Sequence, residues 1–108
     1  MLVRRDVSDR RLIRQVLAGR RESFGVLVER YLHVVHALAY AQTGNHADAE
    51  DVVQETFIKA FQSLSSLRDT GRFPAWLTTI ARRICYGLQR RAQQQLELQQ
   101  KALSRDWV

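Results

Sequence analysis

Four polar residues recur at three- and four-residue steps near the middle of the chain: Asp48, Asp51, Gln54 and Glu55. On an α-helix this spacing places them on one face together with Ile58. The opposite face is apolar and consists of Val52, Val53, Phe57, Ala60, Phe61 and Leu64. Acidic residues in a first turn stabilise the helix dipole, which accounts for Asp48 but not for Glu55, more than one turn further along. The face is therefore predicted to dock on a basic protein surface.

A second polar face lies near the C-terminal end and contains no carboxylate. Helical spacing places Trp76, Leu77 and Ile80 on an apolar side and gathers the polar residues on another. These polar residues are Thr79, Arg82, Arg83, Tyr86, Gln89 and Arg90. Arginine binds phosphates, a tyrosine ring stacks on bases, and hydroxyl and amide groups bond to phosphates or base edges. An ordinary solvated face would carry acids for pairing one turn away, so this face predicts nucleic-acid contact.

The charges of the chain are sorted into separate blocks. Among 108 residues, 17 are Lys or Arg and 11 are Asp or Glu, giving a formal net charge of +6. Residues 4–21 hold seven arginines and two acids, residues 48–55 four acids and no base, and residues 82–91 four arginines and no acid. The cationic surplus favours polyanionic partners. Its separation from the acidic block indicates two different partners.

Several classes of protein are disfavoured by what the chain lacks. The single Cys85 cannot form an intramolecular disulfide, which suits a reducing compartment. No run approaches the ~18 apolar residues of a membrane span, and no apolar run follows Arg4 and Arg5 as in a secretory signal. We therefore expect a cytoplasmic protein without membrane insertion.

Catalysis, metals and cofactors are not expected either. His33 and His36 lie one turn apart but have no third ligand at helical spacing, whereas structural zinc has four ligands. A catalytic thiol would need a positioned base, and none is evident beside Cys85. The acidic face also raises the possibility of a magnesium-dependent nuclease, although acids on a bare helix face are poor support for one.

The apolar periodicity predicts one all-α domain, a compact bundle of about four helices. The expected elements are a helix over about 9–18 with Ser8 as N-cap and Gly19 as the stop, a helix over about 22–42 ended by Gly44-Asn45, a helix over about 47–64 capped near Asn45 or His46, a polar loop over 65–73, and a helix from Pro74 through Arg91. The glutamine-rich residues 92–108 either extend the last helix or begin a linker.

Three segments together resemble a known family. The sequence DAEDVVQETF at 48–57 resembles conserved region 2.2 of sigma-70-type factors. FPAWL at 73–77, followed by IARR at 80–83, resembles regions 2.3 and 2.4 of the extracytoplasmic-function group, and ESFGVLVERY at 22–31 is similar to region 2.1. The resemblance spans about residues 9–91 in the expected order. It implies a sigma region 2 domain over 1–91, with region 2.1 at about 22–42, region 2.2 at about 47–64 and regions 2.3 and 2.4 at about 65–91, and places residues 92–108 before an absent region 4.

The resemblance also implies partners and contact residues. Asp51, Gln54 and Glu55 would contact the β′ clamp helices of core RNA polymerase, on the face shared with Asp48 and Ile58. The 65–73 loop and the start of the last helix would capture the non-template strand of the promoter −10 element, with one base flipped into a pocket. The predicted DNA-binding residues are Arg68, Arg72, Phe73, Thr79, Arg82, Arg83, Tyr86 and Arg90. An anti-sigma factor is a further expected partner, covering the polymerase-binding face.

One departure from the family concerns base recognition. Many members have asparagine where this chain has Arg83, and arginine favours phosphate or guanine instead. Trp76, by contrast, is expected to pack in the core. The alternative functions are a helical protein-interaction adaptor, which would not depend on Arg82, Arg83 or Arg90, and the metal-dependent nuclease, which would depend on Asp51.

Overall fold

The computed structural model describes residues 7–106, with side chains through residue 104, and over this range it contains helices and turns but no strand. Arg4 and Arg5 of the N-terminal basic block lie outside the described residues. The elements are α1 (Asp9–Leu17), α2 (Glu22–Thr43), α3 (His46–Ser63), the 3-10 turns η2 (Leu64–Ser66) and η3 (Thr70–Arg72), and α4 (Phe73–Asp106). The predicted all-α fold with four main helices is confirmed.

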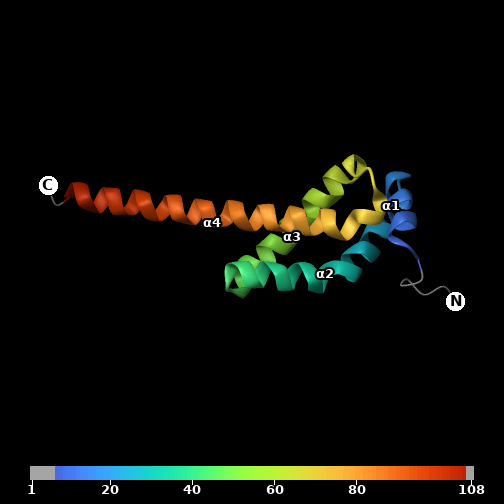
Figure 1. Cartoon of the computed structure of the whole chain (residues 1–108), viewed down its shortest axis with the longest axis horizontal. Coiled ribbons are helices and arrows are strands. Elements are labelled where there is room, and N and C mark those ends of the chain that lie inside the picture. Colours follow the sequence, from blue (N-terminus) through green and yellow to red (C-terminus); the bar gives the residue numbers. More distant parts are fainter. Residues whose placement is uncertain (1–6, 107–108) are drawn as a thin grey trace.

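The helices α2, α3 and α4 pack against one another, and α1 lies across one end of this bundle beside the turns that lead into α4 (Figure 1). The helix α4 has 34 residues, a length of about 51 Å. Its second half therefore projects beyond the other helices, and the described chain measures 71 × 24 × 20 Å. The bundle itself is compact, but the molecule is elongated.

Local hydrogen bonds and backbone geometry explain where the helices begin and end. Ser8 Oγ accepts from the backbone N–H of Arg11 at 3.2 Å, as predicted for the N-cap of α1. Asn45 Oδ1 accepts from the N–H of Asp48 at 2.8 Å and caps α3. Gly44 ends α2 with a φ of 77°, a left-handed conformation that glycine adopts readily and that is unfavourable for residues with a side chain. The start of α4 at Phe73 lies one residue before the predicted start at Pro74.

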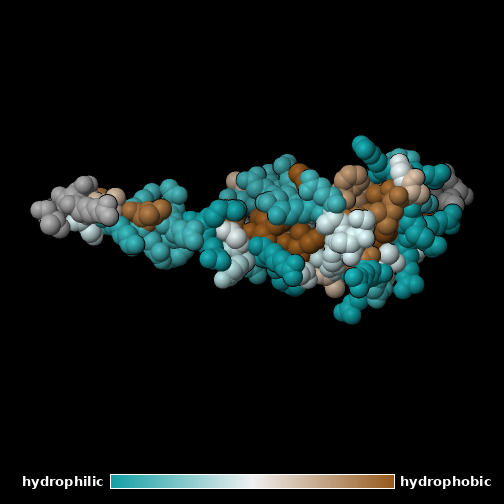
Figure 2. Space-filling view, turned by 90° about the horizontal axis from the view of Figure 1, so that it is seen from above, coloured by the Kyte–Doolittle hydropathy of each residue, from teal (hydrophilic) through white to brown (hydrophobic). Residues whose placement is uncertain are grey.

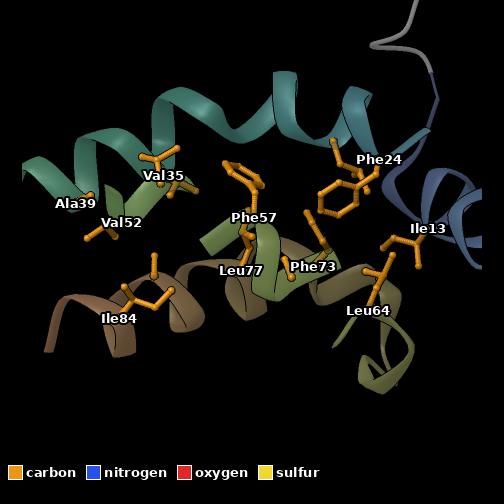
Figure 3. Close-up of a cluster of buried hydrophobic side chains, with 14 of the residues drawn as sticks. Ile13, Phe24, Val35, Ala39, Val52, Phe57, Leu64, Phe73, Leu77 and Ile84 are labelled. Carbon is orange, nitrogen blue, oxygen red and sulfur yellow. The ribbon is translucent and has the colours of Figure 1, made fainter. Parts of the chain in front are cut away.

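One cluster of buried apolar side chains holds the elements together. Side chains from α2 and α4, among them Phe73, point toward one another across the bundle, and Phe57 of α3 lies between the two helices (Figure 3). The ring of Phe73 lies 5.5 Å from that of Tyr31 and 5.9 Å from that of Trp76, measured between centroids. Trp76 is half-buried against this cluster, which agrees with its predicted place in the core.

Polar contacts fasten α1 to α2 at the edge of this core. The carboxylate of Asp9 accepts hydrogen bonds from Arg30 Nη1, at 2.7 Å, and from the hydroxyl of Tyr31. Burial of the phenol, followed by its hydrogen bond to Asp9, raises the pKa of Tyr31 to about 12. The hydrogen bond that joins Tyr31 of α2 to Asp9 of α1 therefore requires a protonated Tyr31.

Residues after Arg91 continue α4 without a break as far as Asp106. Three leucines are exposed on this projection: Leu96, Leu98 and Leu103. Figure 2 shows apolar surface on the projection, and it is separate from the apolar strip that runs along the bundle between hydrophilic margins. The domain boundary at residue 91 stays a prediction. Across the described residues, no helix has the length and hydropathy needed to cross a membrane.

Candidate protein and nucleic-acid interfaces

The predicted acidic face lies on the outer side of α3. Asp51, Gln54, Glu55 and Ile58 are exposed, and Ile58, at 55%, is among the most exposed large apolar residues of the bundle. Two hollows flank this ridge. Gln54 lines one of about 460 Å³ between α3 and α2, and Glu55 lines another of about 360 Å³ between α3 and α4. Two carboxylates and an amide, followed one turn along α3 by the exposed apolar side chain of Ile58, make this ridge suited to a basic protein surface that also offers an apolar contact.

Asp48 differs from the other members of the acidic face. It is half-buried, and its Oδ2 accepts from Asn45 Nδ2 at 2.8 Å while its own N–H donates to Asn45 Oδ1. This reciprocal pair stabilises the first turn of α3. The first-turn explanation therefore accounts for Asp48, and its contact with a protein partner stays a prediction.

The loop between α3 and α4 is anchored at Asp69. Its Oδ1 accepts from the N–H of Gly71 at 3.0 Å and lies 3.7 Å from Arg10 Nη2 on α1. A Cβ atom at Gly71 would lie only 3.0 Å from the same guanidinium, so a residue without a side chain lets Arg10 rest against the loop. α1 thus contacts the loop through Arg10 and contacts α2 through Asp9. It therefore links the polar junction at Asp9 and Tyr31 to the predicted DNA-binding region.

A pocket of about 400 Å³ lies where this loop meets α4. Its apolar walls include Trp76 and Ile80, and its polar groups include Asp69 and two arginines. The complete lining is Leu67, Asp69, Arg72, Ala75, Trp76, Thr79, Ile80 and Arg83. Apolar walls accept a planar base, guanidinium groups bind its phosphates, and a carboxylate accepts from an exocyclic amine. The composition suits a single nucleotide removed from a stack.

The structure brings together three of the predicted DNA-binding residues in this pocket: Arg72, Thr79 and Arg83. Arg68 is exposed on the loop but does not line the pocket. Thr79 Oγ1 donates to the carbonyl of Ala75 at 2.8 Å, so toward a ligand it acts as an acceptor. Asp69 was missed by the sequence analysis, because an acid in a polar turn carries no pattern that separates a ligand contact from a turn residue.

Phe73 is a correction to the predicted DNA-binding residues. Its side chain is 0% exposed and lies in the core between Tyr31 and Trp76. The prediction that Phe73 contacts DNA is wrong in this structure, because its ring is already surrounded by protein. Its place at the first residue of α4 means that it positions the pocket from beneath.

The remaining cationic residues form a stripe on the outer side of α4. Arg82, Tyr86 and Arg90 are exposed, and the guanidinium of Arg90 lies 5.8 Å from the centroid of the Tyr86 ring. Gln89 lies beside them but its Nε2 donates to the carbonyl of Gln42 at 2.9 Å, which ties α4 to the end of α2. No acid occurs between residues 70 and 96. The stripe therefore presents positive charge together with an aromatic ring.

Two features weighed for chemistry are located as well. Cys85 is 1% exposed, and burial raises the pKa of its thiol. At this position it packs as a small buried apolar residue. In the described part of the chain, no three His, Cys, Asp or Glu side chains converge as a metal site would require.

Comparison with known proteins relates this geometry to a family. The Sigma-70 region 2 family matches residues 27–95. An ECF RNA polymerase sigma-E factor of Salmonella typhimurium is 42% identical over 77 residues, which cover 69% of this chain and 39% of that protein. The ECF RNA polymerase sigma factor BldN of Streptomyces coelicolor is 38% identical over 74 residues, covering 68% of this chain and 28% of that protein. The chain thus spans well under half the length of these curated relatives.

A solved structure shares the fold. The NMR structure of an engineered region 2 of sigmaE in complex with GTAAAA aligns with a TM-score of 0.76 and 35% sequence identity. The alignment covers 85% of this chain and 96% of that one. The described bundle therefore has the architecture of a protein solved with a short nucleic acid bound.

Proposed function

Since this chain belongs to the sigma-70 region 2 family, we propose that it is the promoter-binding domain of an extracytoplasmic-function sigma factor. It binds core RNA polymerase and the non-template strand of the promoter −10 element during transcription initiation. The observation that carries the proposal is the pocket between the loop and α4, whose Arg72 and Arg83 adjoin a cationic stripe. The domain works in the cytoplasm as a binding module and catalyses no reaction.

The DNA half of the proposal follows from the chemistry of the pocket. Removing a base from its stack costs a few kcal/mol. Burial of the base against the apolar side chains of Leu67, Trp76 and Ile80 offsets part of this unstacking energy. Arg72 and Arg83 neutralise the neighbouring phosphates, and Asp69 accepts from a base amine. The similar sigmaE domain, solved with GTAAAA, supports single-stranded DNA as the ligand.

The polymerase half rests on the ridge of α3. Asp51 and Glu55 present carboxylates on the same exposed face as Ile58, and Gln54 adds an amide that both donates and accepts. A basic helical surface such as the β′ clamp helices complements this arrangement. The same ridge is the surface that an anti-sigma factor would cover, which would keep the domain from the polymerase.

A binding measurement with short oligonucleotides tests the DNA half. We expect fluorescently labelled GTAAAA to bind more tightly than a permuted hexamer of identical composition, measured by anisotropy. Arg83→Ala should weaken binding of GTAAAA by about tenfold, the effect of losing one well-placed arginine contact. Arg14→Ala, which removes an exposed arginine from α1, is the matched control and should change little. Equal affinity for both hexamers contradicts base recognition, and equal losses in both variants contradict binding of the strand at this pocket.

A charge reversal tests the polymerase half. Glu55→Arg should weaken binding to purified β′ clamp helices by at least tenfold, because it replaces an attraction with a repulsion at the ridge. Glu97→Arg, on the projecting part of α4, makes the same change in net charge and should leave this affinity nearly unchanged. Unchanged binding of the Glu55→Arg domain would show that the polymerase contacts another surface.

A further inference from the structure

The hollow between α3 and α4 adjoins the nucleotide pocket. It is lined by Glu55, Lys59, Ser63, Ile80, Arg83, Ile84, Gly87 and Arg91. Ile80 and Arg83 line both spaces, so the two follow one another along α4. A DNA strand that leaves the nucleotide pocket past Arg83 would enter this second hollow, which we call the α3/α4 groove.

The α3/α4 groove is cationic and open. Lys59 contributes one positive charge from α3, and Arg83 and Arg91 contribute two from α4, against the single carboxylate of Glu55. Gly87 has no side chain, and the space that a Cβ atom there would face is open, with nothing within 4 Å. An extended polyanion can therefore lie close to the backbone of α4 with cations on both sides.

The contact between Glu55 and Lys59 does not close the groove. Glu55 Oε1 lies 3.8 Å from Lys59 Nζ, one helical turn away, and the two side chains are 47% and 55% exposed. Exposed pairs of this type are weak. A phosphate can displace the carboxylate from Lys59, and a polymerase that binds Glu55 would release the lysine in the same way.

We propose that the α3/α4 groove binds the phosphates of the DNA strand adjoining the hexamer, through Lys59 and Arg91. The proposal rests on the proposed function, since it continues the strand whose flipped nucleotide occupies the pocket. Lys59 and Arg91 come from different helices, so both sides of the strand are contacted. Neither residue belongs to the face predicted to bind nucleic acid from sequence.

Oligonucleotides of two lengths test this path. The probes are GTAAAA alone and GTAAAA extended by four thymidines at the 5′ or the 3′ end, because thymidine adds phosphates with little further recognition. One of the two extended probes should bind roughly fivefold more tightly than the hexamer. Two added phosphate contacts should also steepen the dependence of log affinity on log salt by about 1.4.

Three variants locate the gain. The Lys59→Ala/Arg91→Ala domain should lose the gain and the extra salt dependence while keeping its affinity for the hexamer. The Arg14→Ala/Lys101→Ala domain removes the same charges from exposed positions outside the groove and should keep both. Glu55→Gln, which removes the competing carboxylate, should tighten only the extended probe.

The results separate the two proposals. If the hexamer binds but neither extension adds affinity, or if both double variants lose the gain equally, the groove does not bind the strand. If the wild-type domain binds no hexamer, the −10 proposal fails. An oligothymidine of twenty nucleotides then tests the groove alone. Weaker binding of that probe by Lys59→Ala/Arg91→Ala than by the control variant supports the groove, and equal binding overturns it.

Discussion

Raising the pH above 10 should lower the free energy of unfolding through the Tyr31–Asp9 hydrogen bond that joins α1 to α2. In the folded chain the pKa of Tyr31 is about 12, because burial and the hydrogen bond to Asp9 both disfavour the phenolate. In the unfolded chain the phenol titrates at its usual value of 10.0. The stabilisation is therefore complete below pH 10 and is lost as the pH rises from 10 to 12.

The size of the effect follows from the two pKa values. At pH 11 the unfolded phenol is mostly ionised and the folded one mostly protonated, a difference of about 1.4 kcal/mol by proton linkage. Solvent at the partly exposed Tyr31 ring screens the charge and reduces this to about 1 kcal/mol. The free energy of unfolding of the Tyr31→Phe variant should therefore fall by about 1 kcal/mol less than that of the wild type when the pH is raised to 11.

Urea unfolding followed by helical circular dichroism at pH 8 and pH 11 measures the difference. Comparing wild type with Tyr31→Phe cancels the contributions of all other groups, which are present in both proteins. Tyr40→Phe is the matched control, since Tyr40 is exposed, and it should follow the wild type. Equal losses of unfolding free energy in wild type and Tyr31→Phe would refute the assignment of this pH dependence to Tyr31.

Three further experiments test the helix ends and the core. Asn45→Ala should lower the unfolding free energy in urea by about 1 kcal/mol, because α3 loses its cap, whereas Asn45→Ser should retain most of it; equal stability of the two variants would contradict the cap. Gly44→Ala should lower the melting temperature, since a side chain at a φ of 77° costs about 1 kcal/mol, and an unchanged temperature would show that the turn relaxes. Cys85 should react with iodoacetamide roughly a hundredfold more slowly in the folded protein than in urea, and similar rates would place the thiol outside the core.

Features that depend on near neighbours in the chain were predictable from sequence. The caps at Ser8 and Asn45 involve hydrogen bonds across three residues, so the residue types alone indicate them. The exposed ridge of Asp51, Glu55 and Ile58 follows from helical spacing, because the apolar residues of α3 must face the core. Local geometry and burial together decided these positions.

Features that join distant segments were decided by the tertiary structure. Phe73 stands between a polar loop and a cationic stripe in sequence, yet Tyr31 of α2 and the rest of the core enclose its ring. Asp69 and Arg83 meet in one pocket only because the loop folds back on α4, and a loop has no period that predicts its path. Lys59 of α3 and Arg91 of α4 line the same α3/α4 groove for a similar reason. The packing of the helices sets which exposed faces become neighbours, whereas periodicity sets only which faces are exposed.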